Sequence, residues 1–234
     1  YKSTVTGKIL SGGDLILVRD AIGDAVDWML DNGKIVRIET PSVVDFLKQN
    51  RMVDAIRLYK EINGFKIAFV FGSMYSAGAE QAMLVDLEEA NANSDYQIVY
   101  FHGGEEKVHA YEDWKQASCH NLVDHGADLV IGSHPHVLQP METYNGVNIV
   151  YSLGNFIFGG NNYPENRTLI YNQTLTITQD SATGGFTVAN TDITLIPCYV
   201  YTGESNNYQP AVIENETDKQ LVIDFMQGKR ELPY

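Results

Sequence analysis

Three histidines stand where predicted strands end. His134 and His136 follow the short apolar run 129–131, and His102 follows the apolar run 96–101. Continuous apolar runs are typical of buried parallel strands, and ligands bind beyond the carboxyl ends of such strands. Mixed imidazole and carboxylate ligands suit Mn, Zn or Fe. The histidines are therefore candidates for a divalent metal site that activates water for hydrolysis.

Two carboxylates and one amide are candidates for the same pocket. Asp14 and Glu39 lie at short predicted strands in the N-terminal part of the chain, and Asn155 closes the predicted strand 147–151. Two metals about 3.5–4 Å apart could clamp the attacking and leaving oxygens of a phosphoester. The alternatives are structural: Asp14 as a turn residue, and Asn155 bonded to its own backbone.

Two long strings carry a resemblance to a known family. Residues 126–142 read GADLVIGSHPHVLQPME, and residues 148–158 read NIVYSLGNFIF. These strings resemble the bacterial capsule-synthesis family of the CapA/PgsA poly-γ-glutamate type, which is similar in fold to the calcineurin-like metallophosphoesterases. The resemblance implies an α/β, metallophosphoesterase-like sandwich of mixed sheets flanked by helices. It also implies a role in capsule or poly-γ-glutamate synthesis or export at the extracellular face of the bacterial cell envelope.

The resemblance also implies roles for single residues. His102, Gly104 and Glu106 match the family string His-Trp-Gly-x-Glu-Tyr, in which Gly103 here replaces the Trp. Asp14 matches a family Gly-Asp, and Glu39 resembles the acidic residue of a family Asn-Leu-Glu-x-Pro string. The implied metal ligands are Asp14, Glu39, His102, Glu106, His134 and His136. Catalytic roles are implied for His102, His136 and Asn155.

One expected part of the family pattern is absent from the sequence. The family supplies an Asn-Asn-His string and an Asp-x-Gly, and the chain between about 45 and 65 has neither. One metal or none is therefore expected in place of a complete dinuclear centre. Two functions stay open: a metal-dependent hydrolase acting on a phosphoester or envelope polymer, and a non-catalytic member of a polymer-assembly complex that binds an anionic chain or a partner.

Composition narrows the class of protein. The 234 residues have 44% hydrophobic content, which supports a folded core, and a formal net charge of −14, which disfavours nucleic acid as a partner. The expected partners are the capsule-polymer synthesis machinery or an anionic polymer. No apolar run is long enough to span a bilayer. The start at Tyr1, without Met, is compatible with removal of an N-terminal signal peptide or anchor.

The elements expected around the site form one domain, 1–234, with a β-rich second layer at 165–200. Glycine-bounded alternation predicts an antiparallel ribbon from strands 168–178 and 186–197. Helical spacing of apolar residues predicts the helices, and the two cysteines, Cys119 and Cys198, are expected to be unpaired. The predicted helices include 21–30, 77–90, 108–125 and 215–227.

Overall fold

The computed structural model describes residues 55–159 and 162–233, which belong to one compact unit, Val53–Tyr234. Two predicted metal ligands, Asp14 and Glu39, lie outside the described residues. The segment near residue 50, where a family string is missing, lies outside them as well. Glu106, His102, His134, His136 and Asn155 are all described.

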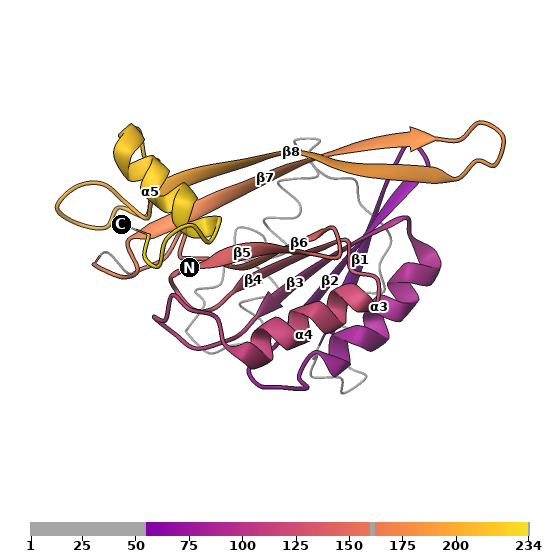
Figure 1. Ribbon diagram of the computed structural model, residues 1–234, viewed down its shortest axis with the longest axis horizontal. Helices are drawn as coiled ribbons and strands as arrows, with labels where there is room; N and C mark the ends of the chain where they lie inside the picture. Colours follow the sequence, from indigo (N-terminus) through magenta and orange to yellow (C-terminus); the bar gives the residue numbers. More distant parts are fainter. Residues whose placement is uncertain (1–54, 160–161, 234) are drawn as a thin grey trace, which may run out of the picture. The chain divides into compact units, whose positions relative to one another are not determined.

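A six-stranded sheet forms the centre of the described unit (Figure 1). Its strands lie in the order β1-β2-β3-β4-β6-β5. The four central strands, β2, β3, β4 and β6, are parallel to one another. The outer strands, β1 and β5, pair antiparallel through tight turns. The bounds are β1 Ala55–Ile62, β2 Phe65–Ser73, β3 Tyr96–His102, β4 Leu129–Ser133, β5 Leu138–Tyr144 and β6 Val147–Leu153.

Two helices, α3 (Gln81–Asn93) and α4 (Asp113–Asp124), cover one face of this sheet (Figure 1). Strand residues such as Val70, Val99 and Val130 alternate toward the helices and are fully buried there. Because alternate residues of a strand point to opposite faces, these three mark the helix-facing side of adjacent strands.

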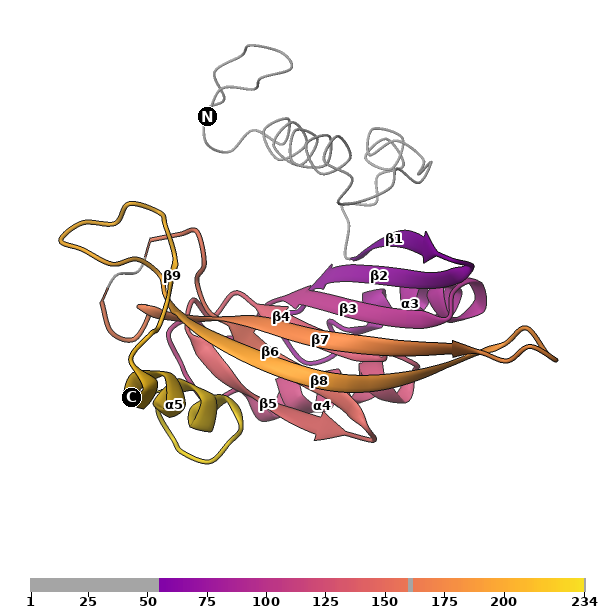
Figure 2. The ribbon, with the colours of Figure 1, turned by 90° about the horizontal axis from the view of Figure 1, so that it is seen from above.

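The second face is covered by an antiparallel ribbon and a helix (Figure 2). Strands β7 (Arg167–Gln179) and β8 (Phe186–Tyr199) pair along most of their length, and β8 also pairs with the short β9 (Ala211–Val212). Helix α5 (Glu216–Met226) packs Val222, Phe225 and Met226 into a core shared with β5, β6 and β8. The fold is therefore the expected α/β sandwich of a mixed sheet and an antiparallel sheet flanked by helices.

The structure differs from the expected elements in three places, at β5, α4 and α3. Strand β5 was not expected. Its Pro140 takes no place in the β5–β6 register, and β5 is an edge strand, where proline is tolerated. Helix α4 begins at Asp113, not at residue 108. The carbonyls of Val108 and Ala110, which precede the helix, accept hydrogen bonds from the buried Gln139 side chain. These carbonyls therefore do not take part in a helix.

Helix α3 also begins later than expected, at Gln81, after a turn at 76–80. Both cysteines are free and buried, and Cys119 lies in the core between the sheet and its helices. In the described ranges, none of the helices has the length and apolar character needed to cross a membrane.

Candidate metal site

The parallel strands bring the site residues to one edge of the sheet. In the register of β2, β3 and β4, Ser73 lies beside His102, and His102 lies beside Ser133. Because parallel strands end at the same edge, the segments that follow them emerge together. His134 follows β4, and Asn155 follows β6. The expected position at the strand carboxyl ends is confirmed.

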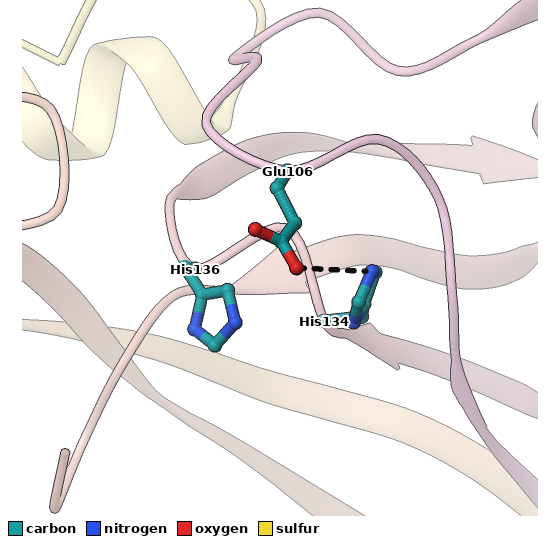
Figure 3. A group of neighbouring side chains, drawn as sticks. All are labelled: Glu106, His134 and His136. Carbon is teal, nitrogen blue, oxygen red and sulfur yellow. Dashed lines mark ion pairs between the residues drawn. The ribbon is translucent and has the colours of Figure 1, made fainter. Parts of the chain in front are cut away.

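Three side chains from two loops converge at this edge (Figure 3). One ligand atom each from Glu106, His134 and His136 lies within 4.8 Å of the others. Glu106 Oε1 is 3.9 Å from His134 Nε2. The two loops are tied together, since the backbone N–H of Lys107 donates to the carbonyl of Pro135 at 2.7 Å. We call Glu106, His134 and His136 the metal-site trio.

Both histidines of the trio have left-handed backbone conformations. The φ angle is +102° at His134 and +60° at His136. Residues other than glycine rarely adopt positive φ, and such strain clusters at functional sites. With Pro135 between them, the two unusual conformations aim both imidazoles toward Glu106 instead of along a strand.

A hydrogen bond fixes the tautomer of His136. Its Nδ1 lies 2.8 Å from Oδ1 of Asn155, and Nδ2 of Asn155 donates to the carbonyl of Gly159 at 3.2 Å. The amide oxygen is only an acceptor, so the hydrogen-bond network assigns the proton to His136 Nδ1. The other ring nitrogen, Nε2, then carries a lone pair that is available to a metal.

A longer chain of hydrogen bonds fixes His134. Its Nδ1 lies 3.1 Å from His102 Nε2, and His102 Nδ1 lies 3.0 Å from Ser133 Oγ. Ser133 Oγ in turn donates to the carbonyl of Phe101 at 3.5 Å. Because the Ser133 hydroxyl proton points to that carbonyl, its oxygen accepts from Nδ1–H of His102. Nε2 of His102 is then the acceptor for His134. His134 then carries its proton on Nδ1, and its Nε2 lone pair faces Glu106.

Loss of solvent favours the neutral form of two site histidines, His102 and His134. Burial lowers the pKa of His102 below the ordinary histidine value, and the nearby His134 and His136 lower it further. Burial also lowers the pKa of His134, although the Glu106 carboxylate opposes that shift. Metal ligation needs the unprotonated imidazole, so these shifts prepare the ring nitrogens for a metal at neutral pH.

A buried lysine supports the loop that holds Glu106. Lys115 is fully buried, and its Nζ donates to Gln139 Oε1 at 2.7 Å and lies 3.8 Å from Glu112 Oε2. Glu112 Oε1 accepts from the backbone N–H of Glu105 at 2.6 Å. A Cβ at Gly104 would lie 2.4 Å from Lys115 Nζ. The loop that carries Glu106 therefore packs directly against Lys115 and Glu112.

The structure divides the predicted site residues. It brings Glu106, His134 and His136 together, and it places His102 and Asn155 behind the two imidazoles as hydrogen-bond partners. The metal and catalytic roles assigned to these residues stay predictions. The sequence did not indicate that Ser133 bonds to His102. Its position at the strand end, directly before His134, is the signal that could have suggested a role in the site.

The donor set fits a divalent metal of the Mn, Zn or Fe type. Two imidazoles and a carboxylate are the ligands that these metals accept, and each imidazole has a hydrogen-bond partner on its other nitrogen. Glu106 is 56% exposed, so the trio is open to solvent on that side. Three protein ligands with an open position are typical of catalytic sites, whereas structural sites are closed.

Comparisons with known proteins identify the family of this chain. The family described as bacterial capsule synthesis protein PGA_cap matches residues 36–160, more than half of the chain. The PGA biosynthesis protein CapA of Bacillus subtilis (strain 168) is 29% identical over 175 residues, covering 64% of this chain and 44% of that protein. The capsule biosynthesis protein CapA of Bacillus anthracis is 29% identical over 192 residues, covering 73% of this chain and 44% of that protein.

The chain thus spans less than half the length of these two relatives. Among solved structures, a hypothetical protein from Thermus thermophilus aligns with a TM-score of 0.41 at 16% identity, over 62% of each chain, and nothing is inferred from so slight a likeness. The family match, which includes the strings around the metal-site trio, shows that this chain belongs to the bacterial capsule synthesis protein family PGA_cap.

Proposed function

We propose that this chain is a metal-dependent phosphoesterase of bacterial capsule biosynthesis, with Glu106, His134 and His136 as metal ligands. One observation carries the proposal. The trio presents two imidazoles and a carboxylate within 4.8 Å, and both imidazoles have their Nδ1 atoms occupied by hydrogen bonds. A cluster assembled only for stability would gain nothing from two strained histidine backbones.

A divalent Mn, Zn or Fe ion bound there would polarise a phosphoryl oxygen as a Lewis acid and lower the pKa of a bound water. The residues of the chain have separate tasks. Asn155 orients His136, and the Ser133–His102 pair orients His134. Both ring nitrogens of His102 take part in this chain of hydrogen bonds, so its task is to position His134.

The capsule part of the proposal comes from the relatives. Both CapA proteins are described as biosynthesis proteins, one of PGA and one of capsule, and they match this chain over more than half of its length. The chain is therefore expected to act with the capsule-polymer synthesis machinery at the extracellular face of the cell envelope.

A second function is favoured by one observation. The sequence between about 45 and 65 lacks the family's Asn-Asn-His string, whereas a two-metal phosphoesterase needs ligands for a second ion. The second candidate is a non-catalytic subunit that uses one metal to bind an anionic group of the capsule polymer.

Metal titration of the full chain, purified without a histidine tag and stripped with chelator, tests the proposal. Calorimetry with Mn²⁺ and Zn²⁺ should give about one equivalent bound, and His134→Ala and Glu106→Gln should each weaken binding at least roughly tenfold. His125→Ala is the matched control, because His125 is an exposed histidine on the C-terminal end of α4.

Turnover separates the two functions. Metal-dependent release of phosphate from p-nitrophenyl phosphate, lost in His134→Ala and kept in His125→Ala, would support the phosphoesterase. Metal binding without turnover of mono- or diesters would favour the binding subunit. No metal bound at saturating Mn²⁺ and Zn²⁺ would overturn both.

A further inference from the structure

Two exposed aromatic rings contact the metal-site trio, one at each histidine. Tyr75 lies in the segment between β2 and α3, with its ring centroid 4.9 Å from that of His134 and 6.2 Å from that of His102. Phe158 lies between β6 and β7, with its ring stacked 4.9 Å from that of His136. The His134 and His136 rings are themselves 5.9 Å apart. The two rings therefore contact opposite ends of the histidine pair.

Both rings are held in place yet left in water. Tyr75 is 54% exposed and Phe158 is 52% exposed. Tyr75 follows Met74, whose side chain is fully buried and whose N–H donates to the carbonyl of His102 at 3.0 Å. The carbonyl of Phe158 accepts from Asn206 Nδ2 at 2.7 Å. An exposed ring in contact with a site histidine offers apolar and aromatic surface to a ligand bound at that histidine.

The charges around the trio disfavour a polyanionic occupant. The loop beside it carries Glu105 and Glu106, and the exposed cation of that loop, Lys107, pairs with Glu165 at 3.3 Å. Lys115 is fully buried beneath the loop. A chain of many carboxylates would therefore meet like charge at this edge, whereas a single anionic group at a metal would not.

We propose that Tyr75 and Phe158 form an aromatic bracket that selects phosphoesters with a flat, apolar organic group over polyanionic chains. This inference rests on the proposed function, because the phosphoryl group is placed by the metal at the trio. The aromatic rings offer stacking and edge contacts to the organic group next to it. The bracket is thus a specificity element, and it takes no part in the ligation of the metal.

Non-hydrolysable phosphonates test the bracket by binding alone. On the Mn²⁺-loaded full chain, phenylphosphonate should bind roughly 3- to 10-fold tighter than methylphosphonate, the range expected for one or two aromatic contacts. Tyr75→Ala and Phe158→Ala should each reduce this preference, and the double variant should abolish it. Tyr75→Phe should keep it, as should Val85→Ala, which removes exposed apolar surface on α3.

The outcomes separate this inference from the proposed function. Equal binding of the two phosphonates, or a preference that survives the double variant, overturns the bracket and leaves the phosphoesterase standing. Tighter binding of a γ-linked triglutamate peptide than of phenylphosphonate overturns it as well. Failure of both phosphonates to bind the metal-loaded chain overturns the phosphoesterase, and the bracket with it.

Discussion

The Nδ1 atom of His136 lies 2.8 Å from Oδ1 of Asn155, and this contact joins the end of β6 to the loop that follows β4. Asn155 is 6% exposed, and its amide is held by the carbonyl of Gly159. A metal-ligating histidine almost always has such a partner on its other nitrogen, because the partner fixes the tautomer and the ring orientation. Asn155 therefore positions His136, and under the proposed function it acts on the metal through that ring.

The first prediction concerns this contact. Asn155→Ala is expected to weaken Mn²⁺ binding about 10- to 100-fold, because His136 loses the acceptor that keeps its proton on Nδ1. Asn155→Asp keeps an acceptor oxygen and should restore most of the affinity. Calorimetric dissociation constants check both, with Asn93→Ala as a control, because Asn93 bonds only within α3. Equal affinity of Asn155→Ala and the unaltered chain would contradict the orienting role.

The second prediction concerns acid stability and His109. This side chain is 9% exposed, and its Nδ1 lies 2.8 Å from the carbonyl of Leu138, with the ring against Phe225. Burial lowers the pKa of His109. The unfolded chain therefore takes up a proton first as the pH falls below about 6.5, and the free energy of unfolding decreases with falling pH.

Urea denaturation at pH 7.5 and pH 5.5 measures this effect. The neutral variant His109→Gln keeps an N–H donor for the carbonyl of Leu138, and it should lose less stability between the two pH values than the unaltered chain does. Comparing the pH-dependent loss of unfolding free energy in the two proteins cancels the pH-independent effect of the substitution on stability. An identical loss in both proteins would show that His109 takes up its proton without unfolding.

The strands of the sheet could be predicted because their apolar runs are continuous. Phe65–Ser73, Tyr96–His102 and Val147–Leu153 are at least half-buried on both faces along most of their length, so each apolar run by itself predicts its strand. Strand β5 could not be predicted in the same way, since Pro140 is compatible with it only at an edge, and an edge is a property of the assembled sheet.

The site was predictable in its location and only partly in its chemistry. His102, His134 and His136 follow predicted strands, and Glu106 was reached through the family string alone. The hydrogen bond between His102 and His134 joins residues 32 apart in the sequence, so no local pattern could indicate which of them faces Glu106. The place of Tyr75 beside His134 likewise depends on the neighbouring strand ends.

The third prediction concerns the buried network beneath the site. Lys115→Met should cost about 1–3 kcal/mol of unfolding free energy, because the buried Oε1 of Gln139 loses its donor. Lys219→Met is the matched control; its pair with Glu216 is largely exposed, and its loss should cost about 0–1 kcal/mol. Urea denaturation at pH 7 compares them. Equal stability of the two variants would show that Gln139 finds another donor.

The fourth prediction concerns Gly103, where the family string has a tryptophan. A Cβ at this position would lie 1.6 Å from the carbonyl oxygen of Met74, a backbone atom that cannot move aside without displacing β2. Met74 N donates to the carbonyl of His102, and Gly103 N donates to the carbonyl of Ser133, so the clash falls between the strand ends that carry the site. The glycine is therefore required by the approach of two backbones.

Gly103→Ala is accordingly expected to destabilise the fold by more than about 2 kcal/mol, in the range of overpacked cores, and to reduce metal binding in the fraction that folds. Gly159→Ala is the control, because a Cβ there meets nothing within 4 Å, and it should change stability by no more than about 0.5 kcal/mol. Thermal unfolding followed by circular dichroism measures both. Similar midpoints for the two variants would mean that β2 and β3 can separate at their ends, and the metal-site trio would then tolerate movement of His102.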